Sequence, residues 1–179
     1  MEKYEIKSMV CVFQDNELCA QDSELVEAAK RATENSYSPY SEFKVGAALR
    51  LQNGVVVTGS NQENASYPLG LCAERTAIFH AQHMYPDQPI VALAIAAFAN
   101  GHFYPEPISP CGACRQVMLE VENRNQQPMR VLLYGTSGTH VVDTVKELLP
   151  FLFISESLKK CLQYRISPFS LANKFSTKT

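Results

Sequence analysis

The sequence has no Trp, no large excess of either charge and no apolar run of membrane-spanning length. A formal net charge of −2 offers no general attraction for nucleic-acid phosphates. A polynucleotide channel would also need basic runs with stacking aromatics, which the central sequence lacks. The longest apolar stretch, roughly residues 90–99, is too short for a bilayer, which takes about 20 apolar residues. We therefore expect neither nucleic acid nor a membrane as partner, and a small neutral ligand instead.

The first residues carry charges of both signs and lack the apolar core of a secretion signal. Three of the six cysteines belong to a metal-type pattern described below. The others, Cys11, Cys19 and Cys161, are odd in number and do not have the spacing of a disulfide framework. We expect these three to be buried or idle thiols, with a fourth metal ligand as the alternative. Cysteines without the spacing of a disulfide framework predict a protein of the reducing cytoplasm.

The 179 residues, 46% of them hydrophobic, suit one compact domain. Small apolar residues recur at helical spacing after Ser23, which we expect to be the N-cap of a helix ending before Ser38-Pro39. Two apolar segments, 45–51 and 55–58, flank Asn53-Gly54, the dipeptide most typical of a tight hairpin. An antiparallel strand pair is therefore expected next.

Helices and strands then alternate along the chain: a helix over about 73–83, a strand from residue 90, a loop over 100–110, a helix over 112–123 and a strand over 130–134. This order predicts the α/β class, with three layers (α/β/α) and a mixed sheet of about five strands. The first twenty residues alternate imperfectly and only weakly indicate an edge strand. The basic tail is expected to be a solvated end, with an intersubunit arm as the alternative.

The most informative pattern is Cys72-Ala-Glu74, followed by Pro110-Cys111-Gly-Ala-Cys114. A Cys-x-x-Cys pair alone is more typical of a structural zinc or redox site. Cys72 adds a third soft ligand, and three protein ligands are the number that a catalytic zinc keeps. Glu74, two residues further on, is placed as a general acid and base. The next residue, Arg75, is expected to donate to the sulfurs and offset their charge. The pattern predicts a zinc hydrolase.

Five motifs together resemble the cytidine deaminase family over roughly residues 23–158: Ser38-Pro-Tyr-Ser-Glu-Phe-Lys-Val-Gly-Ala-Ala48, Gly59-Ser-Asn-Gln-Glu-Asn-Ala-Ser-Tyr-Pro68, Cys72-Ala-Glu-Arg-Thr-Ala-Ile78, Pro110-Cys-Gly-Ala-Cys-Arg-Gln116 and Glu147-Leu-Leu-Pro150. A Cys at position 72 is similar to the small tetrameric branch of this family. The resemblance implies a cytidine deaminase-like fold, zinc as cofactor, and hydrolysis of cytidine or deoxycytidine to the uracil nucleoside and ammonia. It also implies a homotetramer with sites shared between subunits.

The resemblance further assigns roles to individual residues. Three cysteines would hold zinc, Glu74 would activate water, and the remaining positions would contact the nucleoside: Phe43 packing on the substrate, Asn61, Gln62 and Glu63 at the sugar, the Ala73 N–H and the Ser109 carbonyl at the pyrimidine edge, and Phe153 in a neighbouring subunit's pocket. Phe151 is a close competitor of Phe153 for this last role.

Three segments depart from the family pattern: an N-terminal extension (1–22), the loop 100–109 directly before the second ligand motif, and a C-terminal tail (159–179). The catalytic domain is accordingly expected over 23–158. Two other functions remain open from the motifs: a deaminase acting on another aminated pyrimidine, and a catalytically silent zinc-stabilised assembly module.

Overall fold

The predicted hairpin is formed by β2 (Lys44–Leu51) and β3 (Val56–Ser60) in the computed structural model, which describes residues 1–158. Gly54 adopts φ +87°, a value that side-chain-bearing residues rarely reach, and its N–H donates to the Leu51 carbonyl at 2.9 Å. The expected basic tail lies outside the described residues. In the described part, no helix has the length and apolar character that crossing a membrane requires.

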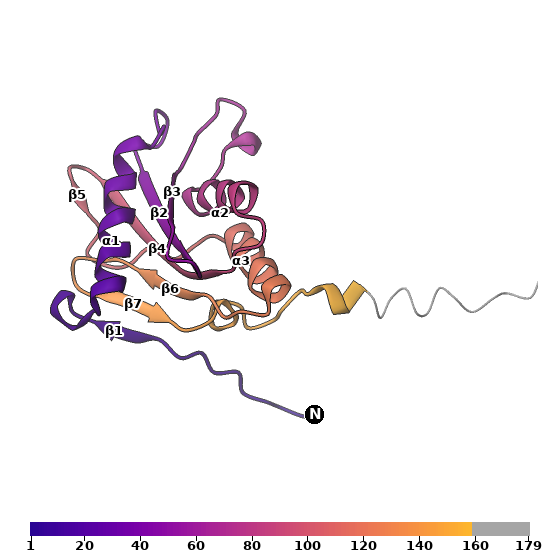
Figure 1. Ribbon diagram of the computed structural model, residues 1–179. Helices are drawn as coiled ribbons and strands as arrows, with labels where there is room; N and C mark the ends of the chain where they lie inside the picture. The colour runs from indigo at the N-terminus through magenta and orange to yellow at the C-terminus, as the bar shows by residue number, and fades with distance from the viewer. Residues whose placement is uncertain (159–179) are drawn as a thin grey trace, which may run out of the picture.

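Within residues 1–158 the sheet contains seven strands and not the expected number of about five, in the order β1-β7-β6-β4-β2-β3, with β5 paired to β4 (Figure 1). β4 (Ile90–Ala99) runs parallel to β6 (Arg130–Leu133), and every other pairing is antiparallel. The edge strand weakly indicated in the first twenty residues is β1 (Cys11–Phe13). The strands missing from the sequence prediction are also short: β5 (His102–Phe103) and β7 (Thr139–Val142). Two to four residues are too few to produce a recognisable alternation.

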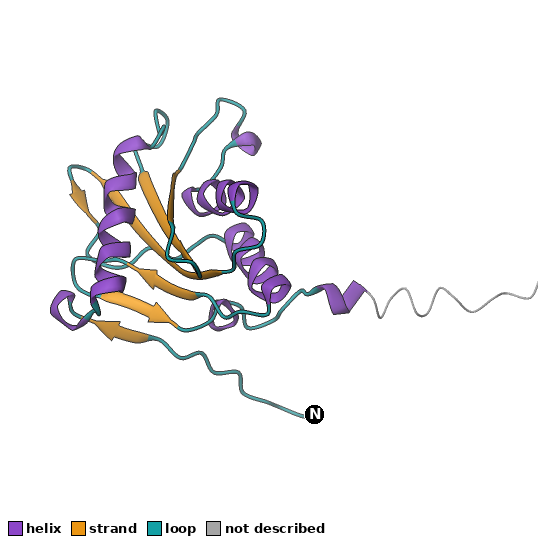
Figure 2. Cartoon of the chain, in the orientation of Figure 1, coloured by secondary structure: helices purple, strands orange, loops and turns teal. Residues whose placement is uncertain are grey.

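The expected three layers are confirmed, because α1 (Ala20–Ala32) covers one face of the sheet while α2 (Ala73–Met84) and α3 (Gly112–Asn125) cover the other (Figure 2). Side chains alternate along the central strands, so Leu93 and Ile95 face α2 and α3, whereas Ala92 and Ala94 face α1. Four short 3-10 helices complete the described elements: Asp15–Glu17, Thr33–Asn35, Tyr67–Leu69 and Val145–Leu148.

Small residues on the α1 face allow this helix to lie close to the sheet. A Cβ built on Gly46 would stand only 2.1 Å from the Ala29 carbonyl oxygen, so no larger residue fits there. On the opposite face, larger side chains fill the space beneath α2 and α3. The beginnings of these two helices are thereby held over one end of the sheet, next to each other.

The first helix begins earlier than expected, with Cys19 and not Ser23 as its N-cap. The reason is Asp22, a charged residue that is expected at the surface but is buried in the first turn of the helix. Its carboxylate lies 3.5 Å from Arg50 on β2 and 3.0 Å from Arg130 on β6, the strands on either side of β4. A long-range ion pair therefore extends the helix beyond the point at which local capping signals place its start.

Candidate metal centre and active site

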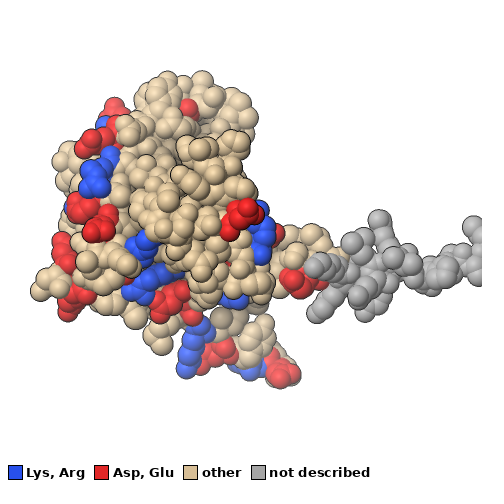
Figure 3. Space-filling view, in the orientation of Figure 1, with Lys and Arg blue, Asp and Glu red and all other residues tan. Residues whose placement is uncertain are grey.

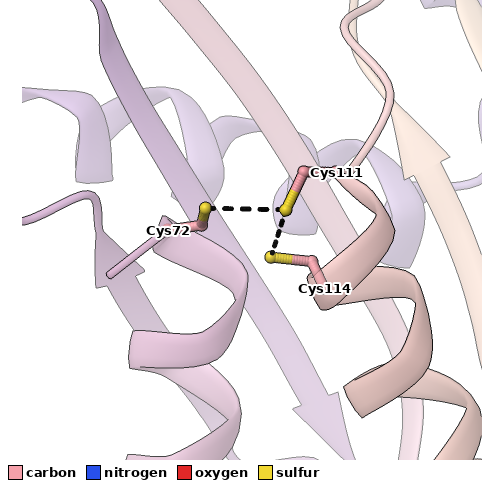
Figure 4. Close-up of side chains that lie close together, drawn as sticks. All are labelled: Cys72, Cys111 and Cys114. Atoms are coloured by element: carbon pink, nitrogen blue, oxygen red, sulfur yellow. Dashed lines mark hydrogen bonds between the residues drawn. The ribbon is translucent and has the colours of Figure 1, made fainter. Parts of the chain in front are cut away.

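Three cysteine sulfurs converge where α2 and α3 begin (Figure 4). Cys72 and Cys111 are the N-cap residues of the two helices, and Cys114 lies in the first turn of α3. The Sγ of Cys111 is 3.8 Å from that of Cys72 and 3.4 Å from that of Cys114, and all three sulfurs lie within 4.8 Å of one another. A tetrahedral zinc with bonds of ~2.3 Å separates its sulfurs by roughly 3.8 Å. The donor set therefore fits zinc in both chemistry and size.

The group holds three ligands and no fourth among residues 1–158. Cys11 and Cys19 lie outside it and are exposed, so of the two expected states, buried or idle, they are not buried, and neither is the fourth ligand. Cys161 lies beyond the described part of the chain. Three protein ligands in this region match the number found at catalytic zinc sites.

Charge is unevenly distributed over these sulfurs. The pKa of Cys72 is lowered to about 5, chiefly because the Cys114 thiol donates to its sulfur and also because Arg75 does so. The same bond to Cys72, together with burial and the charge of Glu74, raises the pKa of Cys114. The Arg75 guanidinium lies 3.8 Å from the Cys72 sulfur. Crowding several thiolates here is unfavourable without a compensating cation, which is the condition that a divalent metal relieves.

Glu74, the second residue of α2, is only 4% exposed and lines the same cavity as Cys72 and Cys111. Its pKa is raised, first because burial removes water from the charged carboxylate and also because Cys72 carries negative charge nearby. A carboxyl group with a raised pKa both accepts and returns a proton more readily near neutral pH. The arrangement therefore provides a proton-transfer group beside a metal-type donor set.

A cavity of about 630 Å³ opens beside these residues. It is large enough for a small organic ligand. The predicted residues that line it are Phe43, Asn61, Gln62, Glu63, Cys72, Glu74, Ser109 and Cys111. Lining residues that the sequence interpretation missed include Tyr40, Ser41, Tyr67, Leu71, Ile95 and Ile108. The second set is mostly aromatic or apolar, so no polar motif distinguished it from ordinary packing.

Two of the predicted substrate contacts, Ala73 and Phe153, are absent from the cavity lining. Ala73 is fully buried as the first residue of α2. Phe153 is 58% exposed, and its carbonyl accepts a hydrogen bond of 2.8 Å from the Gln116 side chain. The 3-10 helix over residues 145–148 is tied to the second ligand motif by Arg115, which donates to the Pro110 and Leu148 carbonyls, each at 2.8 Å.

Asn61 holds one wall of the cavity in place. Its Oδ1 accepts from the Val45 N–H at 2.8 Å and from the Ser36 hydroxyl at 2.5 Å, while its Nδ2 donates to the Phe43 carbonyl at 2.8 Å. These partners lie 16 to 25 residues away in the sequence. The contacts were not foreseen from the motif, because nothing local indicates which loop the amide binds.

Glu63 binds the segment before β2 through Tyr40 and Ser41. Its carboxylate accepts from the Tyr40 N–H at 2.9 Å and from the Ser41 hydroxyl at 2.5 Å. The Ser41 hydroxyl first, and the Tyr40 N–H second, lower the pKa of Glu63. The carboxylate at this end of the cavity is therefore kept ionised and fixed in direction, as a hydrogen-bond acceptor should be.

Residues 19–127 match the model of the cytidine and deoxycytidylate deaminase zinc-binding region. The chain belongs to this deaminase family. Because the matched region binds zinc and the three sulfurs fit that ion, zinc is confirmed as the predicted cofactor.

Relatives and solved structures of the cytidine deaminases agree with this assignment. The chain is 43% identical to the cytidine deaminase of Halalkalibacterium halodurans over 134 residues, covering 75% of this chain and 95% of that protein. It is also 43% identical to that of Sporosarcina psychrophila over 136 residues, covering 75% and 92%. The crystal structure of the Burkholderia pseudomallei cytidine deaminase matches with a TM-score of 0.62 and 45% identity, over 73% of this chain and 97% of the other.

Proposed function

We propose that this chain is a zinc-dependent hydrolase that converts cytidine and deoxycytidine to uridine and deoxyuridine with release of ammonia. The observation that carries the proposal is a buried carboxylate, Glu74, that shares one cavity with the sulfur cluster and with Asn61 and Glu63. The cytidine deaminase names of the relatives support it. The reaction would serve pyrimidine salvage.

Cys72, Cys111 and Cys114 would hold the zinc through their sulfurs. Bound zinc supplies Lewis acidity, the property by which this metal makes water nucleophilic near neutral pH. Arg75, 3.8 Å from the Cys72 sulfur, would offset part of the negative charge of the thiolates.

Glu74 would carry the protons. Water adds to C4 of cytosine, and the Glu74 carboxylate accepts one proton of this water and passes it to N3. It then moves the second proton of the same water to the exocyclic amine. The C4–N bond breaks, and ammonia leaves. The carboxylate ends ionised, as it began, and the oxygen of one water has replaced the amino group on C4. Burial of Glu74 and its raised pKa support this double role.

The other predicted residues would hold the nucleoside. Nδ2 of Asn61 has a second N–H besides the one bound to Phe43, and the ionised Glu63 accepts hydrogen bonds, so the two suit a sugar hydroxyl as donor and acceptor. Gln62 lines the same end of the cavity, and Phe43 offers an aromatic wall for the base. The Ala73 N–H and the Ser109 carbonyl would contact the edge of the pyrimidine.

We also propose a homotetramer with composite sites, in which Phe153 enters a neighbour's pocket. Exposed apolar side chains near the cavity and on α2 support an interface of this kind, among them Tyr67, Leu69, Leu71, Phe79 and Met84. On the face seen in Figure 3 the surface over α2 is largely uncharged, whereas charges of both signs mix along α1.

We also propose that the catalytic domain spans residues 23–158, with an extension before it and a tail after it, and that the protein is cytoplasmic.

The test is the ultraviolet absorbance of cytidine and deoxycytidine, followed in parallel with protein of measured zinc content. Conversion of the cytosine nucleoside to the uracil nucleoside would support the proposal and rank the two sugars. Zinc-loaded protein that changes neither nucleoside would overturn it, and other aminated pyrimidines would then be assayed under the same conditions.

A further inference from the structure

The loop 100–109, where the sequence departs from the family pattern, forms a small hairpin on the end of β4. Asn100 and Gly101 occupy its turn with φ values of +55° and +82°, the pair of positive angles that a two-residue type I′ turn requires. Phe103 pairs with Phe98, and His102 pairs with Ala99. The segment is therefore an ordered extension of the central strand.

Phe103 anchors this hairpin on the α1 side of the sheet. Its ring meets the rings of Phe98 and Tyr134 edge to face, at centroid distances of 5.2 and 5.7 Å. The Lys30 ammonium lies 5.5 Å from the centre of the Phe103 ring. These contacts fix the hairpin against the body of the domain.

Tyr104, the next residue, contacts the wall of the cavity. Its N–H donates to the Ala97 carbonyl at 3.2 Å, and its carbonyl accepts from the Thr136 N–H at 3.0 Å, so its backbone is held on both sides. Its ring meets the Phe43 ring edge to face, at 5.4 Å with an interplanar angle of 61°. Phe43 lines the cavity, whereas Tyr104 does not. Tyr104 therefore supports the aromatic wall from outside the cavity.

We propose that Tyr104 is a positioning residue that fixes the Phe43 ring for contact with the pyrimidine base. This inference rests on the proposed function and assigns part of the base recognition to the hairpin. Edge-to-face pairs have a preferred geometry, so losing the Tyr104 ring frees Phe43 to tilt or rotate. Binding of the base should weaken, while proton transfer by Glu74, which is not part of this ring pair, should continue.

The experiment compares Tyr104→Leu, which keeps bulk but removes the ring, with Tyr104→Phe, which keeps the ring. Zinc content and melting temperature are measured for each purified protein. In Tyr104→Leu we expect KM for cytidine and Kd for uridine, from titration calorimetry, to rise about 3- to 10-fold, as loss of one aromatic pair implies. kcat should change little, and Tyr104→Phe should behave like the unmodified protein.

A double-mutant cycle tests whether Tyr104 acts through Phe43. In a Phe43→Leu background, Tyr104→Leu should cause no further rise in the Kd of uridine. An active unmodified enzyme whose Tyr104→Leu variant keeps its KM and Kd would overturn the inference alone, as would equal losses in both Tyr104 variants. Zinc-loaded protein that binds uridine but leaves cytidine unchanged would overturn only the proposed reaction. Zinc-loaded protein that neither binds uridine nor converts cytidine would overturn both the proposed reaction and the inference about Tyr104.

Discussion

The Ser41 hydroxyl donates a 2.5 Å hydrogen bond to the Glu63 carboxylate across 22 positions of sequence. This bond joins the loop before β2 to the loop after β3 at the mouth of the cavity. It fixes the direction in which the carboxylate can accept a further hydrogen bond.

Replacing Ser41 by Ala should raise KM for cytidine several-fold with kcat nearly unchanged, because Glu63 loses a partner that orients it. Ser41→Thr keeps the hydroxyl and serves as the matched control. Steady-state kinetics on both variants decide the matter. A KM in Ser41→Ala equal to that of the unmodified protein would show that the bond has no part in binding.

The pH dependence of KM should reflect the same bond. The pKa of Glu63 is lowered, first by the Ser41 hydroxyl. The charged carboxylate is therefore fully present at a pH above the ordinary carboxyl range, and its contribution to binding is lost as pH falls through the lowered pKa. Without the hydroxyl this folded pKa moves up toward its ordinary value. The acid-side rise in KM should therefore begin at a higher pH in Ser41→Ala than in the unmodified protein.

Glu74→Gln should retain zinc and the melting temperature while losing turnover by about 10²- to 10⁴-fold, because the amide cannot accept the proton that the reaction releases. Glu74 is buried, and Gln nearly preserves its volume, so the packing is maintained. Metal analysis and the absorbance assay are run on the same preparation. Full activity in a zinc-loaded Gln variant would refute the proton-carrying role.

Cys114→Ala should lose zinc and lower the melting temperature, since the binding energy of the metal contributes to folding. Cys114 is fully buried at the start of α3, whereas Cys11 is exposed and outside the sulfur group, so Cys11→Ala is the control. A chelator should lower the melting temperature of the unmodified protein and of Cys11→Ala, and leave that of Cys114→Ala nearly unchanged. Undiminished zinc in Cys114→Ala would remove this cysteine from the ligand set.

Glu122→Ala should destabilise the fold by about 2–4 kcal/mol, because it leaves buried N–H groups without an acceptor. The Glu122 carboxylate accepts from the Met129 and Val145 N–H groups at 3.0 and 2.8 Å, and from the Thr144 hydroxyl at 2.6 Å. Urea unfolding gives the free energy, and Glu120→Ala, at an exposed position of the same helix, should change it little. Similar values for the two variants would contradict this account.

Phe153→Ala should raise KM in an oligomer of unchanged size if the ring completes a neighbour's pocket. Phe151→Ala provides the comparison, since both rings are exposed in the single chain and only one is assigned this role. Kinetics are combined with light scattering to exclude dissociation. A raised KM in Phe151→Ala alone would transfer the role to that residue.

Local signals predicted the parts of the fold in which a few adjacent residues determine the outcome. Asn53-Gly54 marked its hairpin, and the cysteine spacing placed Cys111 and Cys114 in one helical turn. Asn100-Gly101 carries the same turn signal, but the prolines that follow it favoured a loop, so β5 was missed. That signal could have led to β5.

Contacts between distant segments could not be predicted in this way. Burial of Asp22 depends on Arg50 and Arg130, and the start of α1 changes with it. The sequence likewise gives no sign that Asn61 and Glu63 bind the loop 36–45, because their partners become neighbours only when β2 and β3 pair. The motif identified these two residues, and the tertiary fold determines what they hold.

The N-terminal strand has a consequence for solubility. β1 pairs with β7 and so occupies the backbone groups that β7 would otherwise present at the border of the sheet. The Met9 N–H is also occupied, by the Glu147 carboxylate at 2.8 Å. An uncovered border strand is a template for aggregation between molecules. In this chain the border on the β7 side belongs instead to a three-residue strand preceded by charges of both signs, an arrangement that discourages the pairing of strands from other molecules at this border.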